Sequence, residues 1–305
     1  MQDDSDLGTS STLPNGVQIP GYRLRREAGS DAIGVWFDAV QESLRRYVTV
    51  RVLKPQLEAH EAARREFLAE MERLSPLVHP NLARVIDSHR EGTLFLVVER
   101  LAAQTVAQLL EPGKPLGAAV ALKITRGLAR ALAYLAEHGY AHKNVTPRLV
   151  SLREDGEPRL ATFRNVITFE ELAALRGRLA QDALYVAPEQ LAGEEPIGPR
   201  TPCYQIAAFL FHLLAGRAPH EGEVKEVARA HLTQPFPSLK RFQPFLAQGI
   251  YDLVAACTRR ETAERPDLPR VVTALEALVE GRDPGLKDEA KGPIVAPRPR
   301  RRRRR

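Results

Sequence analysis

The stretch His142-Lys143-Asn144-Val145-Thr146-Pro147-Arg148-Leu149 decides how this chain is interpreted. A long helical pattern precedes it, because residues 118–137 carry apolar side chains at steps of three and four. Five further short motifs surround it, and each of them alone is a weak signal. They are His79-Pro80-Asn81, Leu94 to Glu99, Tyr185 to Glu189, Leu214 to Pro219 and Glu264-Arg265-Pro266. Their fixed order along the chain is a strong signal.

Together these motifs resemble the protein kinase superfamily, and most closely the bacterial Ser/Thr kinases of the eukaryotic-like type. The resemblance implies an α+β, bilobal protein-kinase-like fold, with a small antiparallel β lobe that includes one helix and a larger helical lobe. We therefore predict a kinase-like domain over 20–282, divided into lobes at 20–100 and 101–282. A flexible acidic segment at 1–19 and a disordered Arg-rich tail at 283–305 are expected to flank it.

The composition bounds the class of protein. With 44% hydrophobic residues the chain can bury a normal core, which excludes wholesale disorder. No apolar run approaches the ~18 residues of a membrane span, so no transmembrane segment is predicted. Cys203 and Cys257 have no metal-binding or redox spacing and fit buried thiols in a reducing compartment. Because the N-terminus also lacks a signal-peptide pattern, we expect a cytoplasmic location.

The net charge of +6 is a property of the tail, because seven of the last eight residues are arginine. Without them the chain is nearly neutral, so its overall basicity is no argument for nucleic-acid binding by the folded part. The segment Arg298–Arg305 itself is expected to attract polyanions, either nucleic acid or anionic lipid. A solvated tail without a specific partner is the alternative.

The resemblance implies a catalytic loop at 142–149, and the chain departs from the family there. Asn144 stands in place of the catalytic Asp, Thr146 in place of the Lys and Leu149 in place of the metal-binding Asn. A neutral amide cannot accept a proton, although it can orient a hydroxyl group. An alkyl group cannot ligate Mg²⁺. Only the structural residue His142 and the following proline of this loop match the family.

The family's metal-binding D-F-G motif corresponds to Thr162-Phe163-Arg164. Phe163 keeps the structural position, whereas Thr162 replaces the metal-binding Asp and Arg164 replaces the Gly. Phosphoryl transfer in this family depends on metal ions that neutralise charge on the β- and γ-phosphates. With both protein ligands replaced, we expect no metal site and predict a catalytically inactive domain, a pseudokinase.

Gly29 and Gly34 frame the position of the family's glycine-rich loop, whose backbone N–H groups lie over phosphates. Asp31 occupies the place of the second glycine and brings a negative charge to this site. One interpretation is weakened nucleotide binding, since like charges about 4 Å apart repel by about 4 kcal/mol at an effective dielectric of 20. The other interpretation is an ordinary hairpin turn, in which Asp is common.

Four further residues are remnants of the nucleotide cleft by the same resemblance. Arg51 stands where the family has its strand lysine, and Glu70 stands where a helix glutamate pairs with that lysine. Val98 would be the gatekeeper and Glu99 the first hinge residue. The Arg51–Glu70 pair would be either a firm bidentate lock without a nucleotide role or a solvated pair of little energy.

Four cations occupy motif positions around the cleft, namely Arg51, Lys143, Arg148 and Arg164. Because two anionic family residues are replaced, these cations could attract an anion without a metal, such as phosphate, a nucleotide without Mg²⁺ or a phosphopeptide. The alternative is that they point to solvent or pair with glutamates.

The activation segment between the D-F-G and A-P-E positions departs from the family as well. Thr168 followed by Glu171 and apolar steps predicts a capped helix. A helix over the cleft would block protein substrates. By contrast, Glu189 and Arg265 match the residues that form a buried structural ion pair in the family.

From these residues we predict a binding, scaffolding or regulatory module that is not an enzyme and has an unidentified protein partner. No cofactor is expected, unless the cleft takes ATP or another nucleotide without Mg²⁺. A weak, atypical Ser/Thr protein kinase with residual ATP binding is one alternative. A nucleic-acid or anionic-membrane binder driven by the Arg tail is the other.

Overall fold

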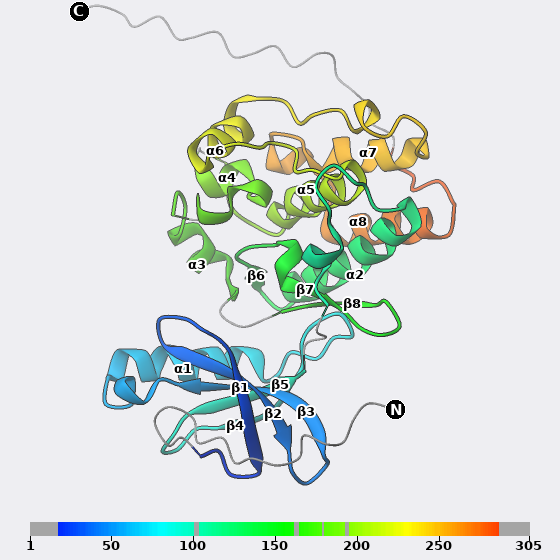
Figure 1. The fold of residues 1–305 in the computed structure, drawn as a ribbon. Coiled ribbons are helices and arrows are strands. Elements are labelled where there is room, and N and C mark those ends of the chain that lie inside the picture. Colours follow the sequence, from blue (N-terminus) through cyan, green and yellow to red (C-terminus); the bar gives the residue numbers. More distant parts are fainter. Residues whose placement is uncertain (1–17, 101–103, 162–164, 179, 193–194, 287–305) are drawn as a thin grey trace, which may run out of the picture.

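The computed structural model describes residues 18–100, 104–161, 165–178, 180–192 and 195–286. They form two lobes, a small one built on a β-sheet and a larger helical one (Figure 1). This arrangement confirms the predicted α+β, bilobal fold. Within the described residues, no helix is both long and apolar enough to cross a membrane.

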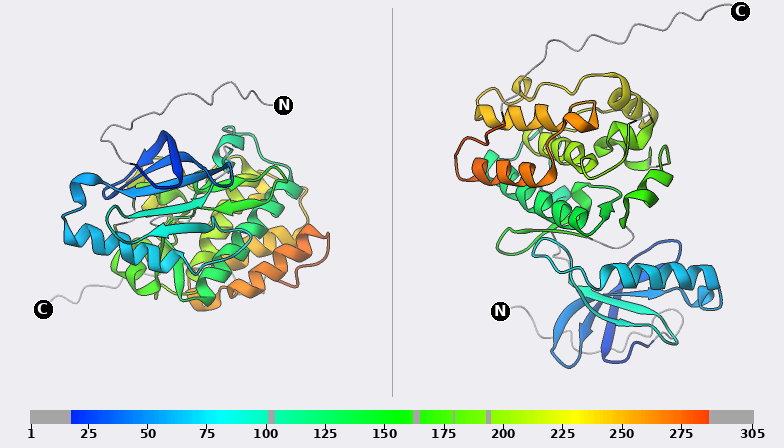
Figure 2. Two further views of the ribbon diagram at one scale, coloured as in Figure 1. Left: turned by 90° about the horizontal axis from the view of Figure 1, so that it is seen from below. Right: turned by 180° about the vertical axis from the view of Figure 1, so that it is seen from behind.

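The small lobe is one antiparallel sheet with a helix on one face. The strand order is β1-β2-β3-β5-β4. The bounds are β1 Tyr22–Ser30, β2 Gly34–Gln41, β3 Arg46–Leu53, β4 Val85–His89, β5 Phe95–Glu99 and α1 Glu61–Leu74, with a short 3₁₀ turn at Pro55–Leu57. Figure 2 shows α1 lying across the sheet.

The alternation of side chains along β3 explains why this strand lies at the centre. Val48, Val50 and Val52 belong to the core cluster on the outer face of the sheet, whereas Leu53 belongs to the main core beneath α1. Arg51 lies between the valines in sequence and therefore faces α1, because successive side chains in a strand point to opposite faces. A buried arginine is thus placed on the face of the sheet that packs against α1.

The large lobe consists mainly of helices, with two short β ladders in which β6 pairs with β9 and β7 with β8. The helices are α2 Ala118–Glu137, α3 Phe169–Ala174, α4 Pro188–Leu191, α5 Thr201–Ala215, α6 Val224–Thr233, α7 Gln248–Cys257 and α8 Leu268–Val279. The strands are β6 Tyr140–His142, β7 Val150–Leu152, β8 Pro158–Leu160 and β9 Val166–Thr168. Short 3₁₀ helices are η2 Val106–Leu109, η3 Pro147–Leu149, η4 Ala180–Tyr185, η5 Leu239–Arg241 and η6 Thr262–Glu264.

Helix α5 is the centre of the large lobe. Every one of its residues except His212 is buried, and it packs against α2, α7 and α8. A nearly continuous apolar sequence suits a helix that is covered on all sides. The chain stays packed beyond α8 as far as Leu286, which is 5% exposed.

Glu189 and Arg265 form the structural ion pair that was predicted. Arg265 Nη1 donates to Glu189 Oε1 at 2.6 Å and Nη2 donates to Oε2 at 2.9 Å, and both side chains are fully buried. Arg265 also donates through Nε to the Arg259 carbonyl and lies over the Tyr204 ring. The pair ties α4, at the end of the activation segment, to the segment before α8.

We expect Arg265→Ala to lower the free energy of unfolding by about 3–5 kcal/mol, because it leaves the Glu189 carboxylate buried without its partner. The measurement is urea unfolding followed by circular dichroism. Arg282→Ala is the matched control, since its ion pair with Glu280 is exposed and contributes only about 0–1 kcal/mol. Equal effects of the two substitutions would contradict this account.

Two buried histidines carry protons poorly in the folded state. His142 on β6 lies 3.0 Å from the Ala161 carbonyl, and burial lowers its pKa to about 4. His231 on α6 lies 2.7 Å from the Tyr204 hydroxyl, and burial, together with the nearby His220, lowers its pKa to about 3. Both side chains are therefore neutral in the fold at neutral pH.

This difference predicts a loss of stability in mild acid. Below pH 6.5 the unfolded chain binds protons at these histidines while the folded chain does not, so the free energy of unfolding falls as pH drops from about 6.5 toward 4. Each histidine contributes up to about 1.4 kcal/mol per pH unit. Urea midpoints between pH 7 and 5 measure the slope, which should become flatter in His231→Gln. A His231→Gln slope equal to that of the wild type would refute the assignment.

Candidate functional site: the contacts of Arg51 in the small lobe

The turn between β1 and β2 is organised by Asp31. Its backbone N–H donates to the Gly34 carbonyl at 2.9 Å. Its Oδ1 accepts hydrogen bonds from the backbone N–H groups of Ile33 and Gly34, each at 2.9 Å. A side chain that binds backbone groups two and three residues ahead is a common way to stabilise a turn. The hairpin-turn interpretation of Asp31 therefore describes its local geometry.

Asp31 also forms an ion pair, which the hairpin-turn interpretation did not include. Its Oδ2 lies 2.9 Å from Arg51 Nη2. Burial alone would raise the pKa of Asp31, but Arg51 and the N–H groups of Gly34 and Ile33 outweigh burial, so the pKa lies below its usual value. The Asp31 carboxylate is therefore ionised at neutral pH.

Arg51 is the centre of the site. Its side chain is fully buried, and its Nη1 donates to Glu70 Oε2 on α1 at 2.5 Å. Its guanidinium carbon lies 4.8 Å from the centre of the Phe67 ring, which adds a cation–π contact. Of the two interpretations of the Arg51–Glu70 pair, the structure has the buried pair and not the solvated one.

Both glycines of the loop allow close approach of a side chain. A Cβ atom at Gly29 would lie 2.6 Å from Trp36 Nε1, and one at Gly34 would lie 2.9 Å from the Arg51 guanidinium. Glycine at these positions is therefore required by packing inside the small lobe, whatever ligand the loop contacts. Trp36 was not singled out from the sequence, although its place after the last glycine was a usable signal.

The hinge is attached to the large lobe through an ion pair. Val98 is fully buried in β5, as expected for a gatekeeper, and Glu99 follows it at the end of the strand. Glu99 pairs with Arg159 on β8, so the small lobe contacts the large one directly at this point. Sequence reasoning missed Arg159, because nothing in its neighbourhood marks it as the partner of a residue 60 positions away.

The catalytic-loop positions lie between β6 and η3. Asn144 is partly buried and Thr146 is 6% exposed. Leu149 packs against the main hydrophobic core, and its backbone N–H donates to the Thr146 carbonyl at 3.0 Å. The Leu149 side chain therefore contributes to the packing of the hydrophobic core.

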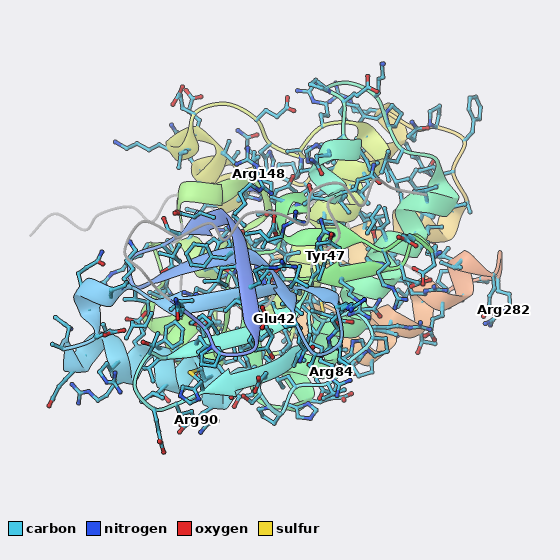
Figure 3. The ribbon with its side chains drawn as sticks, turned by 60° about the horizontal axis from the view of Figure 1, so that its bottom comes forward. Glu42, Tyr47, Arg84, Arg90, Arg148 and Arg282 are labelled. Carbon is cyan, nitrogen blue, oxygen red and sulfur yellow. The ribbon has the colours of Figure 1, made fainter. Side chains whose placement is uncertain are left out.

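The predicted cationic cluster is only partly described. Arg51 already binds two carboxylates. Lys143 is partly buried, and its backbone N–H donates to the Asn165 carbonyl at 2.7 Å. Arg148 is exposed on η3 and is labelled in Figure 3. Arg51 therefore pairs with acidic residues, which was the alternative to anion binding. The attraction of an anion to Lys143, Arg148 and Arg164 stays a prediction.

Several predicted site residues lie outside the described part of the chain. They are Thr162, Phe163, Arg164 and the tail Arg298–Arg305. Among the residues that the structure does describe, no group of three or more His, Cys, Asp or Glu side chains could hold a metal ion. Because Leu149 also offers no oxygen ligand, the described residues do not fit the magnesium site of the family.

The predicted helix of the activation segment is present as α3. Thr168 Oγ1 accepts from the Glu171 N–H at 3.0 Å, and Glu171 Oε2 accepts from the Thr168 N–H at 2.7 Å, which forms a complete capping box. Whether α3 blocks protein substrates stays a prediction.

A further contact connects α3 to the small lobe. Arg73 on α1 donates to the Val166 carbonyl at 2.7 Å and to Glu171 Oε1 at 2.9 Å. The contact holds α1 against the start of the activation segment, with Glu70 directed toward Arg51. Arg73 was missed in the sequence, although its spacing of three residues from Glu70 places it on the same side of the helix.

Curated proteins similar to this chain are Ser/Thr protein kinases of bacteria. Serine/threonine-protein kinase pkn2 of Myxococcus xanthus is 27% identical over 290 residues, which are 90% of this chain and 35% of that protein. PknK of Mycobacterium tuberculosis is 30% identical over 278 residues, 89% of this chain and 24% of that protein. PrkC of Bacillus subtilis is 24% identical over 254 residues, 82% of this chain and 39% of that protein. The chain thus spans well under half the length of these relatives.

These relatives correct the expectation that the domain is not an enzyme. That expectation rested on the replacements at Asn144, Leu149 and Thr162, but all three relatives are named as Ser/Thr protein kinases. The physical reason is that phosphoryl transfer depends mainly on positioning and electrostatic stabilisation. The identity of single side chains does not show whether that positioning is kept.

The family model described as "Protein kinase domain" matches residues 22–275. The match begins at the first residue of β1 and ends within α8, so it includes both lobes. It covers the Arg51–Glu70 pair, the hinge, the catalytic-loop positions and the Glu189–Arg265 pair. The chain therefore belongs to the protein kinase superfamily.

Proposed function

We propose that this domain is an atypical Ser/Thr protein kinase that binds an adenine nucleotide in its cleft and transfers phosphate slowly. The observation that carries the proposal is the buried Arg51–Glu70 ion pair at 2.5 Å. In protein kinases the corresponding strand–helix ion pair must be in place for transfer to occur. The names of the relatives support the same activity.

The proposed chemistry is transfer of a γ-phosphoryl group to a Ser or Thr hydroxyl. The bond between the γ-phosphorus and its bridging oxygen breaks, the hydroxyl oxygen forms the new bond, and the diphosphate leaves. Asn144 can orient the hydroxyl through its amide but cannot take its proton, which has to pass to a phosphate oxygen or to water. A positioned general base contributes roughly 10²- to 10⁴-fold to rate, so we expect a slow enzyme.

The position of α1 supports activity without a phosphorylation switch. Arg73 joins α1 to β9 and α3 through contacts that involve no phosphate group. The hydroxyl of Thr168, which lies in this segment, is engaged in the helix cap. We infer that the Glu70 side chain is held toward Arg51 in the unmodified protein.

We further propose that the domain binds a protein partner, either as its substrate or as a regulatory or scaffolding protein. For Arg298–Arg305 we keep the proposal that the arginines bind a polyanion, either nucleic acid or anionic lipid.

Transfer of labelled phosphate from ATP to the protein itself and to a Ser/Thr-rich test protein measures the activity. We expect a slow reaction that is lost in Arg51→Met. The substitution Asn144→Asp restores a carboxylate that can accept the hydroxyl proton, so it should raise the rate about tenfold or more. Arg90→Met is the control, since Arg90 lies at the outer edge of the small lobe (Figure 3).

Two results would overturn the proposal. One is an absence of transfer by wild-type protein and by Asn144→Asp alike, with Mg²⁺ or Mn²⁺ and at high enzyme concentration. The other is transfer that survives Arg51→Met unchanged, because the activity would then come from a contaminating kinase.

A further inference from the structure

The turn of residues 31–34, which we call the acidic turn, is folded against the small-lobe core. Ile33 is 7% exposed and belongs to the same buried cluster as Leu53 and Phe67. The Ile33 carbonyl accepts a hydrogen bond from the Lys54 N–H at 2.9 Å. The turn therefore lies between β3 and α1, where it is anchored by apolar contact and by backbone hydrogen bonds.

The acidic turn also contacts one side of the Arg51 guanidinium. Nη1 of Arg51 binds Glu70 and Nη2 binds Asp31, and Gly34 lies close against the same group. The Asp31 carboxylate occupies an Nη2 donor of Arg51, and Nε, which has no hydrogen-bond partner among the described residues, is itself buried. A phosphate oxygen would therefore reach the guanidinium on this side only by displacing Asp31.

The charges around Arg51 also oppose the binding of a phosphate group. One guanidinium faces two carboxylates, and the Asp31 side chain is only 15% exposed while that of Glu70 is 8% exposed. The formal charges of the group of three therefore sum to a net negative charge. Each additional phosphate on a ligand brings more negative charge toward it, and the repulsion is screened weakly where water is excluded.

We propose that Asp31 is a specificity-determining residue that competes with ligand phosphates for Arg51. The proposal rests on the nucleotide site proposed above and adds the order in which that site selects its ligands. The cleft binds adenosine and AMP at least as tightly as ADP and ATP, which reverses the preference that a cationic phosphate site would show. The acidic turn thereby keeps ATP occupancy, and with it the transfer rate, low.

Isothermal titration of the full chain with adenosine, AMP, ADP and ATP in EDTA tests this order. In Asp31→Asn the side-chain oxygen still accepts the hydrogen bonds of Ile33 and Gly34, but the negative charge is removed. We expect ATP affinity to rise about tenfold or more, equivalent to about 1.4 kcal/mol, with adenosine affinity changed less than about twofold. Asp38→Asn is the matched control, because it removes the same charge from an ion pair with the exposed Arg26.

A stability measurement separates a binding effect from a folding effect. Asp31→Asn should unfold at lower urea concentration than the wild type, because it removes a partner of the buried Arg51, and yet bind ATP more tightly. If that variant does not fold, Asp31→Gly, which restores the glycine of the family, takes its place in the same titrations. Lower stability together with higher ATP affinity would indicate that Asp31 competes with the ligand phosphates for Arg51.

The negative outcomes are distinguishable. The competition by Asp31 is refuted if wild-type protein binds ATP more tightly than adenosine, or if Asp31→Asn leaves the ratio of these two affinities unchanged. The phosphoryl-transfer proposal is then unaffected, because the transfer assay tests it separately. If wild type, Asp31→Asn and Asp31→Gly all bind none of the four ligands, the nucleotide site itself is refuted and both proposals fall.

Discussion

A fully buried guanidinium is the constraint on which the small lobe depends. Arg51 is fully buried between the sheet and α1, and a charge in such a place is costly unless it is paired and hydrogen-bonded. Glu70 and Asp31 supply that pairing from opposite sides. The helix α1 and the acidic turn are therefore held in position by the same residue.

From this centre the contacts continue into the large lobe. Helix α1 carries Arg73, whose guanidinium binds both the backbone of β9 and the side chain of Glu171 in α3. At the other end of the activation segment, Glu189 is fixed to Arg265 beside α5. A segment that many kinases order through a phosphate group is here held at both described ends by arginine–carboxylate pairs.

Replacement of the family's catalytic-loop residues does not by itself show that kinase activity is absent. Asn144 and Leu149 show which groups are absent, and they account for the expectation of slow chemistry. They do not show whether the cleft still positions its reactants, and the relatives named as kinases outweigh an inference made from those side chains alone. The contacts of Arg51 are a separate property of the site, since in the proposed nucleotide site they concern the binding of phosphate and not the removal of a proton.

The sequence by itself determined the two lobes, the capped start of α3 and the Glu189–Arg265 pair. The capped start of α3 depends on residues three positions apart, which is a local property, whereas the two lobes and the Glu189–Arg265 pair follow from the family resemblance. Only the tertiary structure decided that Asp31 binds Arg51, 20 residues away, and that Arg73 binds Glu171, 98 residues away. With 44 lysines and arginines and 38 acidic residues in the chain, many pairings satisfy charge complementarity. The fold selects among them, because it alone brings particular side chains within hydrogen-bond distance.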